Sequence, residues 1–80
     1  RLVPAPEAPA AAVELCRRLA KGPPIAYRLI KATVNRNLTT DYDGALMNEM
    51  RAQLRCLRSQ DMLEGVMAFF EKREPDFQGR

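Results

Sequence analysis

Apolar residues recur at helical spacing in four stretches of the chain. In the first stretch, roughly Pro9 to Lys21, Leu15 and Leu19 share one face and Arg18 lies opposite. The Lys21-Gly22 pair that follows is a typical helix end, because glycine readily takes the backbone conformation that closes a helix. The pattern predicts a first helix over about residues 9–21.

The second stretch opens at Pro23-Pro24, and proline is well tolerated in a first helical turn. It runs to about Asn35 and is apolar around most of its circumference, with Arg28 and Lys31 as the one clear polar edge. A helix that is apolar on most sides is normally buried on most sides. Three short neighbouring helices could hardly enclose it, so the pattern predicts packing partners outside this chain.

A T-x-x-D pattern formed by Thr40 and Asp43 predicts the start of a long third helix that ends near Leu57. Two contact faces on this helix again indicate further neighbours. One face carries the large residues Leu46, Met50, Leu54 and Leu57, and the other carries the small residues Ala45, Ala52 and Cys56.

The last helix is predicted to start near Ser59 or Asp61, where Asp61 and Glu64 make a D-x-x-E pattern. The Glu74-Pro75 pair ends it, because a residue before proline disfavours the helical conformation. Its broad apolar face holds Met62, Leu63, Val66, Phe69 and Phe70, and Phe77 in the tail is expected to fold back onto a neighbour. The fold class is therefore all-α with about four helices, and no strand is expected at Leu2-Val3.

Composition fits a small globular unit with a thin core. The 80 residues are 46% hydrophobic and 29% charged, and a chain of this size buries only about 60% of its unfolded surface. The net charge of +3 comes from basic residues spread among ten acids, whereas nucleic-acid modules cluster theirs. No apolar run approaches the length of about 18 residues that a membrane helix needs. We therefore expect neither a nucleic-acid nor a membrane partner.

The chain contains no His, and Cys16 and Cys56 are far apart. This composition excludes His-based metal sites and Ser/Cys-His catalysis. Isolated cysteines are typical of a reduced, cytoplasmic setting. Glu49 and Glu64 are single acids that fit capping or surface roles. No catalytic residue and no metal ligand is predicted in this chain.

The end of the chain resembles the C-terminus of the enoyl-CoA hydratase/isomerase (crotonase) family, commonly written S-x-D-x-x-E-G-x-x-A-F-x-E-K-R-x-P-x-F-x-G. The segments GPPIAYRLIKATVN and LMNEMRAQLRCLRSQD resemble the family's preceding helices, so the resemblance covers essentially the whole chain. Every fixed position of the terminal pattern is met, by Ser59, Asp61, Glu64, Gly65, Ala68, Phe69, Glu71, Lys72, Arg73, Pro75, Phe77 and Gly79.

The resemblance implies the C-terminal helical domain of a crotonase-fold protein, with residues 1–8 as a lead-in from a missing core and residues 9–80 as the helical domain. The family's oxyanion hole and catalytic acids lie in that core, and the start at Arg1 without Met fits a piece of a longer polypeptide. The resemblance further implies a homo-oligomer and acyl-CoA as substrate of the full-length enzyme, with no covalently bound cofactor. Phe69, Lys72 and Arg73 match positions that border coenzyme A.

Purely structural roles stay open for two of these residues, since Phe69 also suits a core position and Lys72 a solvated helix-end cation. The leading hypothesis is the C-terminal, oligomerising segment of an enoyl-CoA hydratase or isomerase of fatty acid metabolism, inactive by itself. The alternative is an autonomous helical module that binds a protein partner. About 170–190 residues with alternating strands and helices before Arg1, an estimate from domain size, would favour the enzyme.

Overall fold

The structure, a computed structural model, describes residues 1–80 and consists of helices joined by short turns. The all-α fold with four α-helices is confirmed, and residues 1–4 form no strand. The elements are the 3-10 helix η1 (Ala5–Glu7) and the helices α1 (Ala8–Ala20), α2 (Pro24–Asn37), α3 (Tyr42–Leu57) and α4 (Gln60–Glu71).

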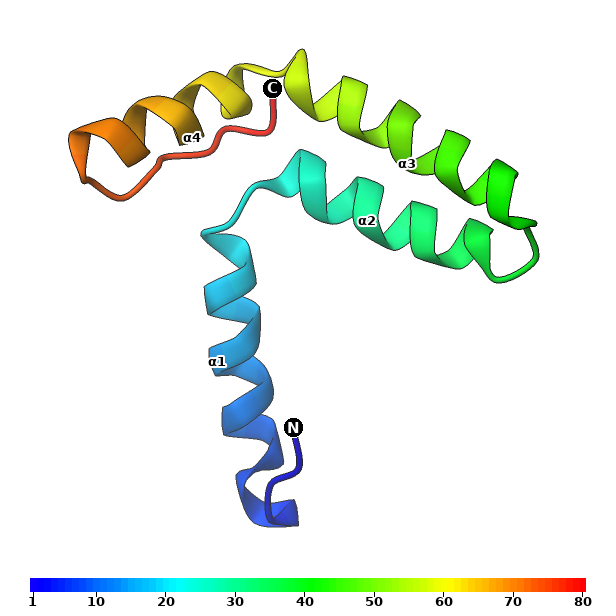
Figure 1. The fold of residues 1–80 in the computed structure, drawn as a ribbon. Coiled ribbons are helices and arrows are strands. Elements are labelled where there is room, and N and C mark those ends of the chain that lie inside the picture. Colours follow the sequence, from blue (N-terminus) through cyan, green and yellow to red (C-terminus); the bar gives the residue numbers. More distant parts are fainter.

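The helices form an open arrangement (Figure 1). Helices α2 and α3 lie antiparallel and side by side, α1 points away from them, and the tail after α4 runs back along α4. The radius of gyration is 15.9 Å, whereas a compact chain of this length has about 12 Å. Only Ala68 and Asp61 are buried, at 1% and 5% exposure. The chain therefore encloses no core of its own.

The small-residue face of α3 is the one that meets α2. Ala52 and Cys56 line a groove shared with Ala26 of α2, and the Asn48 side-chain amide donates to the Asn37 oxygen at 2.9 Å. Small side chains let two helix backbones approach closely, so the neighbour of this face is α2 of the same chain. The large residues of the other face point outward and are each 45–51% exposed, namely Leu46, Met50, Leu54 and Leu57.

The start of α3 corrects the T-x-x-D interpretation. Asp41 is the N-cap, with its backbone extended and its Oδ1 accepting from the Gly44 amide at 2.9 Å. The Thr40 hydroxyl instead donates to the Arg36 carbonyl at 2.7 Å. Thr40 is therefore used by the end of α2, and the cap falls one residue later than predicted.

Both ends of α4 are also more specific than the sequence suggested. Ser59 is the N-cap, since its Oγ accepts from the Met62 amide at 3.1 Å, so the D-x-x-E box is wrong as a cap. The helix ends at Glu71 and not at Glu74. Lys72 adopts the left-handed conformation, and the Arg73 amide donates to the Ala68 carbonyl at 3.0 Å. These contacts close the helix as a Schellman motif before proline can act.

Candidate functional site at helix α4 and the tail

Phe69 lies on the last turn of α4 and is 79% exposed. Its ring meets the ring of Phe70 edge to face, with centroids 5.8 Å apart and an interplanar angle of 76°. Aromatic pairs favour this geometry because the positive ring edge meets the negative face. The pair presents a rigid apolar surface toward the outside of the chain.

Lys72 is the first residue beyond α4 and forms no ion pair. Its φ of 54° and ψ of 40° place it in the left-handed region, which costs a residue with a side chain about 1–2 kcal/mol relative to the right-handed one. The helix-closing hydrogen bonds hold it there. An exposed, unpaired ammonium group thus lies three residues from Phe69.

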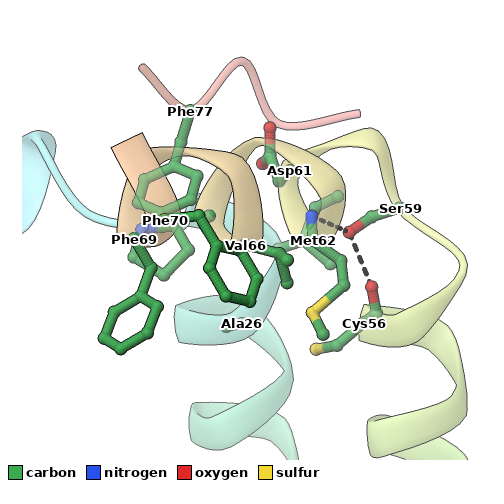
Figure 2. A pocket seen from close by; sticks show the side chains of 12 residues that line it. Ala26, Cys56, Ser59, Asp61, Met62, Val66, Phe69, Phe70 and Phe77 are labelled. Atoms are coloured by element: carbon green, nitrogen blue, oxygen red, sulfur yellow. Dashed lines mark hydrogen bonds between the residues drawn. The ribbon is translucent and has the colours of Figure 1, made fainter. Parts of the chain in front are cut away.

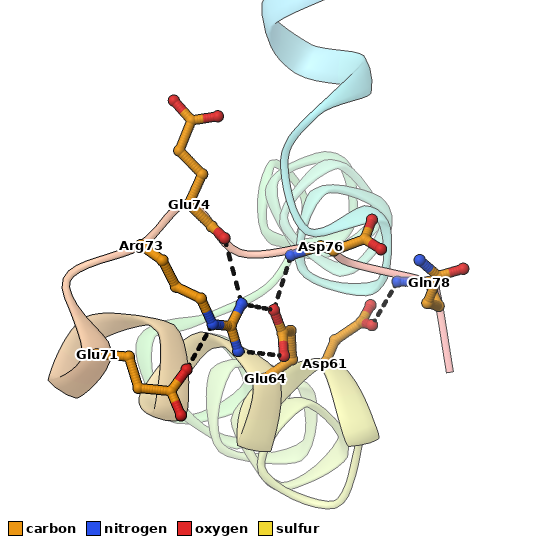
Figure 3. A network of polar contacts seen from close by, with 7 residues as sticks. All are labelled: Asp61, Glu64, Glu71, Arg73, Glu74, Asp76 and Gln78. Atoms are coloured by element: carbon orange, nitrogen blue, oxygen red, sulfur yellow. Dashed lines mark hydrogen bonds and ion pairs between the residues drawn. The ribbon is translucent and has the colours of Figure 1, made fainter.

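Arg73 uses four of its five N–H donors in a polar network (Figure 3). Its Nη1 and Nη2 bind the two oxygens of Glu64 at 2.5 and 3.0 Å, and its Nε binds Glu71 at 2.5 Å. A fourth hydrogen bond runs from Nη1 to the Glu74 carbonyl at 3.2 Å. A guanidinium has five N–H donors, so one remains for any further ligand.

This network shifts the ionisation of its members. The pKa of Glu64 falls from 4.5 to about 2, first because Arg73 donates to its carboxylate and second because the Asp76 amide does. The pKa of Arg73 is raised by its hydrogen bonds to Glu64 and then to Glu71. Hydrogen bonds to the charged form favour that form, so the pair stays ionised over the whole physiological range.

Asp61 has a role that local sequence patterns did not show. Its Oδ1 accepts from the Gln78 amide at 2.8 Å and its Oδ2 accepts from the Gly79 amide at 2.9 Å. In return, the Asp61 amide donates to the Arg80 carbonyl at 2.9 Å. Local helix patterns span three or four residues, so a partner 18 positions away leaves no signal in them.

An apolar pocket of about 580 Å³ lies beside Phe69 (Figure 2). Helix α2 supplies Ile25 and Ala26 to its wall, and the tail supplies Phe77. As predicted, Phe77 folds back, and its ring lies against Gly65 of α4. The remaining apolar wall comes from Cys56 of α3 and from α4, through Met62, Val66, Phe69 and Phe70.

The acidic side chains of the site are paired within the chain, Asp61 with the tail amides and Glu64 and Glu71 with Arg73. The only buried carboxyl group of the site, Asp61, is taken up by backbone amides. No three His, Cys, Asp or Glu side chains gather closely enough to hold a metal ion. None of the helices has the length and apolar character needed to cross a membrane.

These features define an all-helical segment with a partly open apolar pocket, an exposed lysine three residues after Phe69, and apolar faces that the chain itself leaves uncovered. The sequence model of the enoyl-CoA hydratase/isomerase family matches residues 1–80, and the chain belongs to this family.

Individual relatives agree. A crotonyl-CoA hydratase of Syntrophomonas wolfei is 44% identical over 61 residues, covering 76% of this chain and 23% of the relative. The human mitochondrial methylglutaconyl-CoA hydratase is 32% identical over 68 residues, covering 85% of this chain and 20% of the relative. The chain spans about a quarter of the length of the curated relatives it matches.

Solved structures show the same fold. An enoyl-CoA hydratase from Bacillus anthracis superposes with a TM-score of 0.91 at 33% identity, over 98% of this chain and 30% of that one. An enoyl-CoA hydratase/isomerase from Mycobacterium paratuberculosis gives a TM-score of 0.89 at 28% identity, over 98% and 31%. The helices of this chain therefore have the same arrangement as the matching part of these longer proteins.

Proposed function

We propose that this chain is the C-terminal helical segment of an enoyl-CoA hydratase, an enzyme that adds water across the double bond of 2-enoyl-CoA thioesters in fatty acid metabolism. The observation that carries the proposal is the family match along all 80 residues. The names of the two relatives, crotonyl-CoA hydratase and methylglutaconyl-CoA hydratase, support hydration of a CoA thioester. The catalytic groups of such an enzyme lie outside residues 1–80.

The segment acts in assembly. Phe70 is 76% exposed and Ile30 of α2 is 59% exposed, and soluble proteins rarely leave apolar patches of more than a few hundred Å² in water. These faces would be covered by the rest of the enzyme and by other subunits. We expect a homo-oligomer in which this segment forms part of the contact between copies.

The segment also borders coenzyme A. The exposed ring of Phe69 suits stacking with the adenine, and the unpaired ammonium of Lys72 suits the phosphates. Arg73 contributes through its one remaining N–H, while its charge is offset by Glu64 and Glu71. Lys72 is thus the main cation of the proposed site.

The test uses the complete enzyme that carries this chain. Replacing Lys72 with Ala should raise the KM for crotonyl-CoA about tenfold with kcat little changed, because a phosphate contact far from the reacting carbons stabilises the bound substrate and transition state alike. Lys31→Ala, at an exposed lysine on α2, is the matched control. An unchanged KM in the Lys72 variant would remove this residue from the site.

A second measurement addresses the segment by itself. Purified residues 1–80 should not hydrate crotonyl-CoA above the level of an inert protein, because no acid–base pair is present. Hydration well above that level would overturn the proposal that catalysis lies elsewhere.

The gene sequence upstream of Arg1 distinguishes the enzyme from the alternative, an autonomous module that binds a protein partner. An open reading frame that continues upstream of Arg1 with alternating strands and helices supports the enzyme, and a start codon near Arg1 supports the module.

A cytoplasmic location stays a prediction from the two free thiols. Imaging of the tagged full-length protein tests it, with mitochondria as the other outcome, since the human relative is mitochondrial.

A further inference from the structure

The tail after Pro75 is attached to α4 through two carboxylates one helical turn apart. Asp61 accepts from the amides of Gln78 and Gly79, and Glu64 accepts from the amide of Asp76 at 2.8 Å. All three donors are backbone groups, so the attachment holds the backbone of the tail directly; Figure 3 shows the bonds from Asp76 and Gln78.

The same tail reaches the start of α2. Gly79 has a φ of +76°, and a Cβ there would lie 3.2 Å from Cγ of Pro24. On the other side, the Phe77 ring packs on Gly65, where a Cβ would lie 3.5 Å from Cε1 of the ring. The tail therefore touches α4 and the first turn of α2 together, and it supplies Phe77 to the pocket between them (Figure 2).

We propose that residues 74–80 form a strap that joins α4 to α2 and holds Phe77 in the wall of the apolar pocket, with Asp61 and Glu64 as its two fastenings. Loss of the fastenings frees the strap, removes Phe77 from the pocket and uncouples the first turn of α2 from α4. Asp61 and Glu64 are positioning residues in this scheme.

The two fastenings hold different parts of the strap. Asp61 is buried and binds the distal amides of Gln78 and Gly79, whereas Glu64 is partly exposed and binds the proximal Asp76 together with Arg73. Neutralising Asp61 should therefore free the distal end alone. Neutralising Glu64 should free the proximal part while the distal end stays attached.

The test is hydrogen exchange resolved at single amides in the purified protein. In Asp61→Asn, exchange at Gln78 and Gly79 should rise about 10- to 100-fold, because hydrogen bonds to a charged group are lost. Asp43→Asn is the matched control, since Asp43 is likewise the second residue of its helix but has no tail amide to bind. Unchanged exchange in the Asp61 variant, or an equal rise in the Asp43 variant, overturns the proposal.

Two further variants keep the test decisive if Asp61→Asn unfolds α4. Glu64→Gln should raise exchange at Asp76 while Gln78 stays protected, with Glu49→Gln on α3 as control. Gly79→Ala alters no helix and should raise exchange at Gln78 and at the Tyr27 amide, which bonds the Pro23 carbonyl at the start of α2, at least about fivefold, because the left-handed backbone disfavours a side chain. If Gly79→Ala leaves both regions protected, the tail does not join α4 to α2.

Discussion

Glu64 lies between a guanidinium and a backbone amide, and this position makes its charge matter for stability. Arg73 and Glu71 are the charged groups around it, and the Asp76 amide is its third neighbour. Two carboxylates share one guanidinium, so the network depends on Arg73 remaining protonated, which its raised pKa ensures.

The first prediction follows from the depressed pKa of Glu64. With a folded value of about 2 and an ordinary value of 4.5, its contribution to stability is complete above about pH 4.5. It decreases as the pH falls below that value and is lost once the pH has passed through about 2. The amide resonance of Asp76, followed by NMR during acid titration, should move in this window. Glu64→Gln should abolish that movement, and a titration midpoint near 4.5 would contradict the Arg73 contact.

The second prediction concerns the left-handed backbone of Lys72. Lys72→Gly should stabilise the fold by about 0.5–1 kcal/mol, because glycine adopts a φ of 54° without steric cost. Lys72→Ala, which keeps a Cβ, is the control and should show no gain. Thermal unfolding measures both, and a destabilised glycine variant would show that the lysine side chain itself stabilises the helix end.

At the scale of elements, the helix boundaries in this chain depend on individual side-chain oxygens. Asp41 begins α3 and Ser59 begins α4. Each satisfies an amide that the helix leaves without an internal partner. The short turns between the helices therefore have defined ends.

The third prediction tests these caps. Asp41→Ala and Ser59→Ala should each lower the free energy of unfolding by about 1 kcal/mol. Thr40→Val should cost less, since Thr40 bonds back to the Arg36 carbonyl and caps no amide. Chemical denaturation compares the three variants, and an equal or larger loss in the Thr40 variant would restore Thr40 as the start of α3.

The elements themselves could be predicted from the sequence because helical spacing repeats over many residues. Helix α1 was predicted within a residue at each end, and the end of α3 at Leu57 was correct. The cap of α3 was misplaced because Thr40 and Asp43 satisfy the spacing rule, while backbone conformation selects Asp41. For α4, Ser59 was one of the two predicted starts and is the N-cap. The link from Asp61 to Gly79 was missed because it depends on how the tail returns, which periodicity does not encode.

The candidate site was predicted in a different way, from resemblance. Phe69, Lys72 and Arg73 came from the family pattern, and no contact in this chain tests their part in binding coenzyme A. The structure adds the exposure and the pairing of these side chains. Phe69 and Lys72 are exposed, and Arg73 is occupied by Glu64 and Glu71. The contact between Arg73 and Glu64 can be predicted only once the end of α4 is known, because the turn at Lys72 directs Arg73 back toward Glu64.

At the scale of the whole molecule, the shape is flat and open, 43 by 39 by 18 Å. Almost every large apolar side chain is partly in contact with solvent, and the chain buries only Ala68 and Asp61. A chain with so little buried surface gains stability when a partner covers its apolar faces.

The fourth prediction is that the isolated chain forms a homo-oligomer, most simply a symmetric dimer. Sedimentation at micromolar concentration should give a mass above 9.0 kDa. Phe70→Asp and Leu29→Asp should weaken both folding and assembly, because each places a charge on an apolar face. Lys72→Ala is the control and should disturb neither, and a well-folded monomer would contradict the prediction.

Helix α1 has a consequence of its own. It leaves the body of the molecule at the corner formed by Gly22 and Pro23, and a side chain at Gly22 would overlap the Tyr27 hydroxyl. The far end of α1 contacts the lead-in, including an Arg1–Glu14 ion pair at 3.7 Å. A helix with few contacts to the rest of its chain can be exchanged between two copies with little loss of stability in either. If two copies of this chain exchange α1, the turn at Gly22 is therefore the hinge of that domain swap. Shortening or stiffening this turn would then decide whether α1 stays on its own copy or packs on the other one.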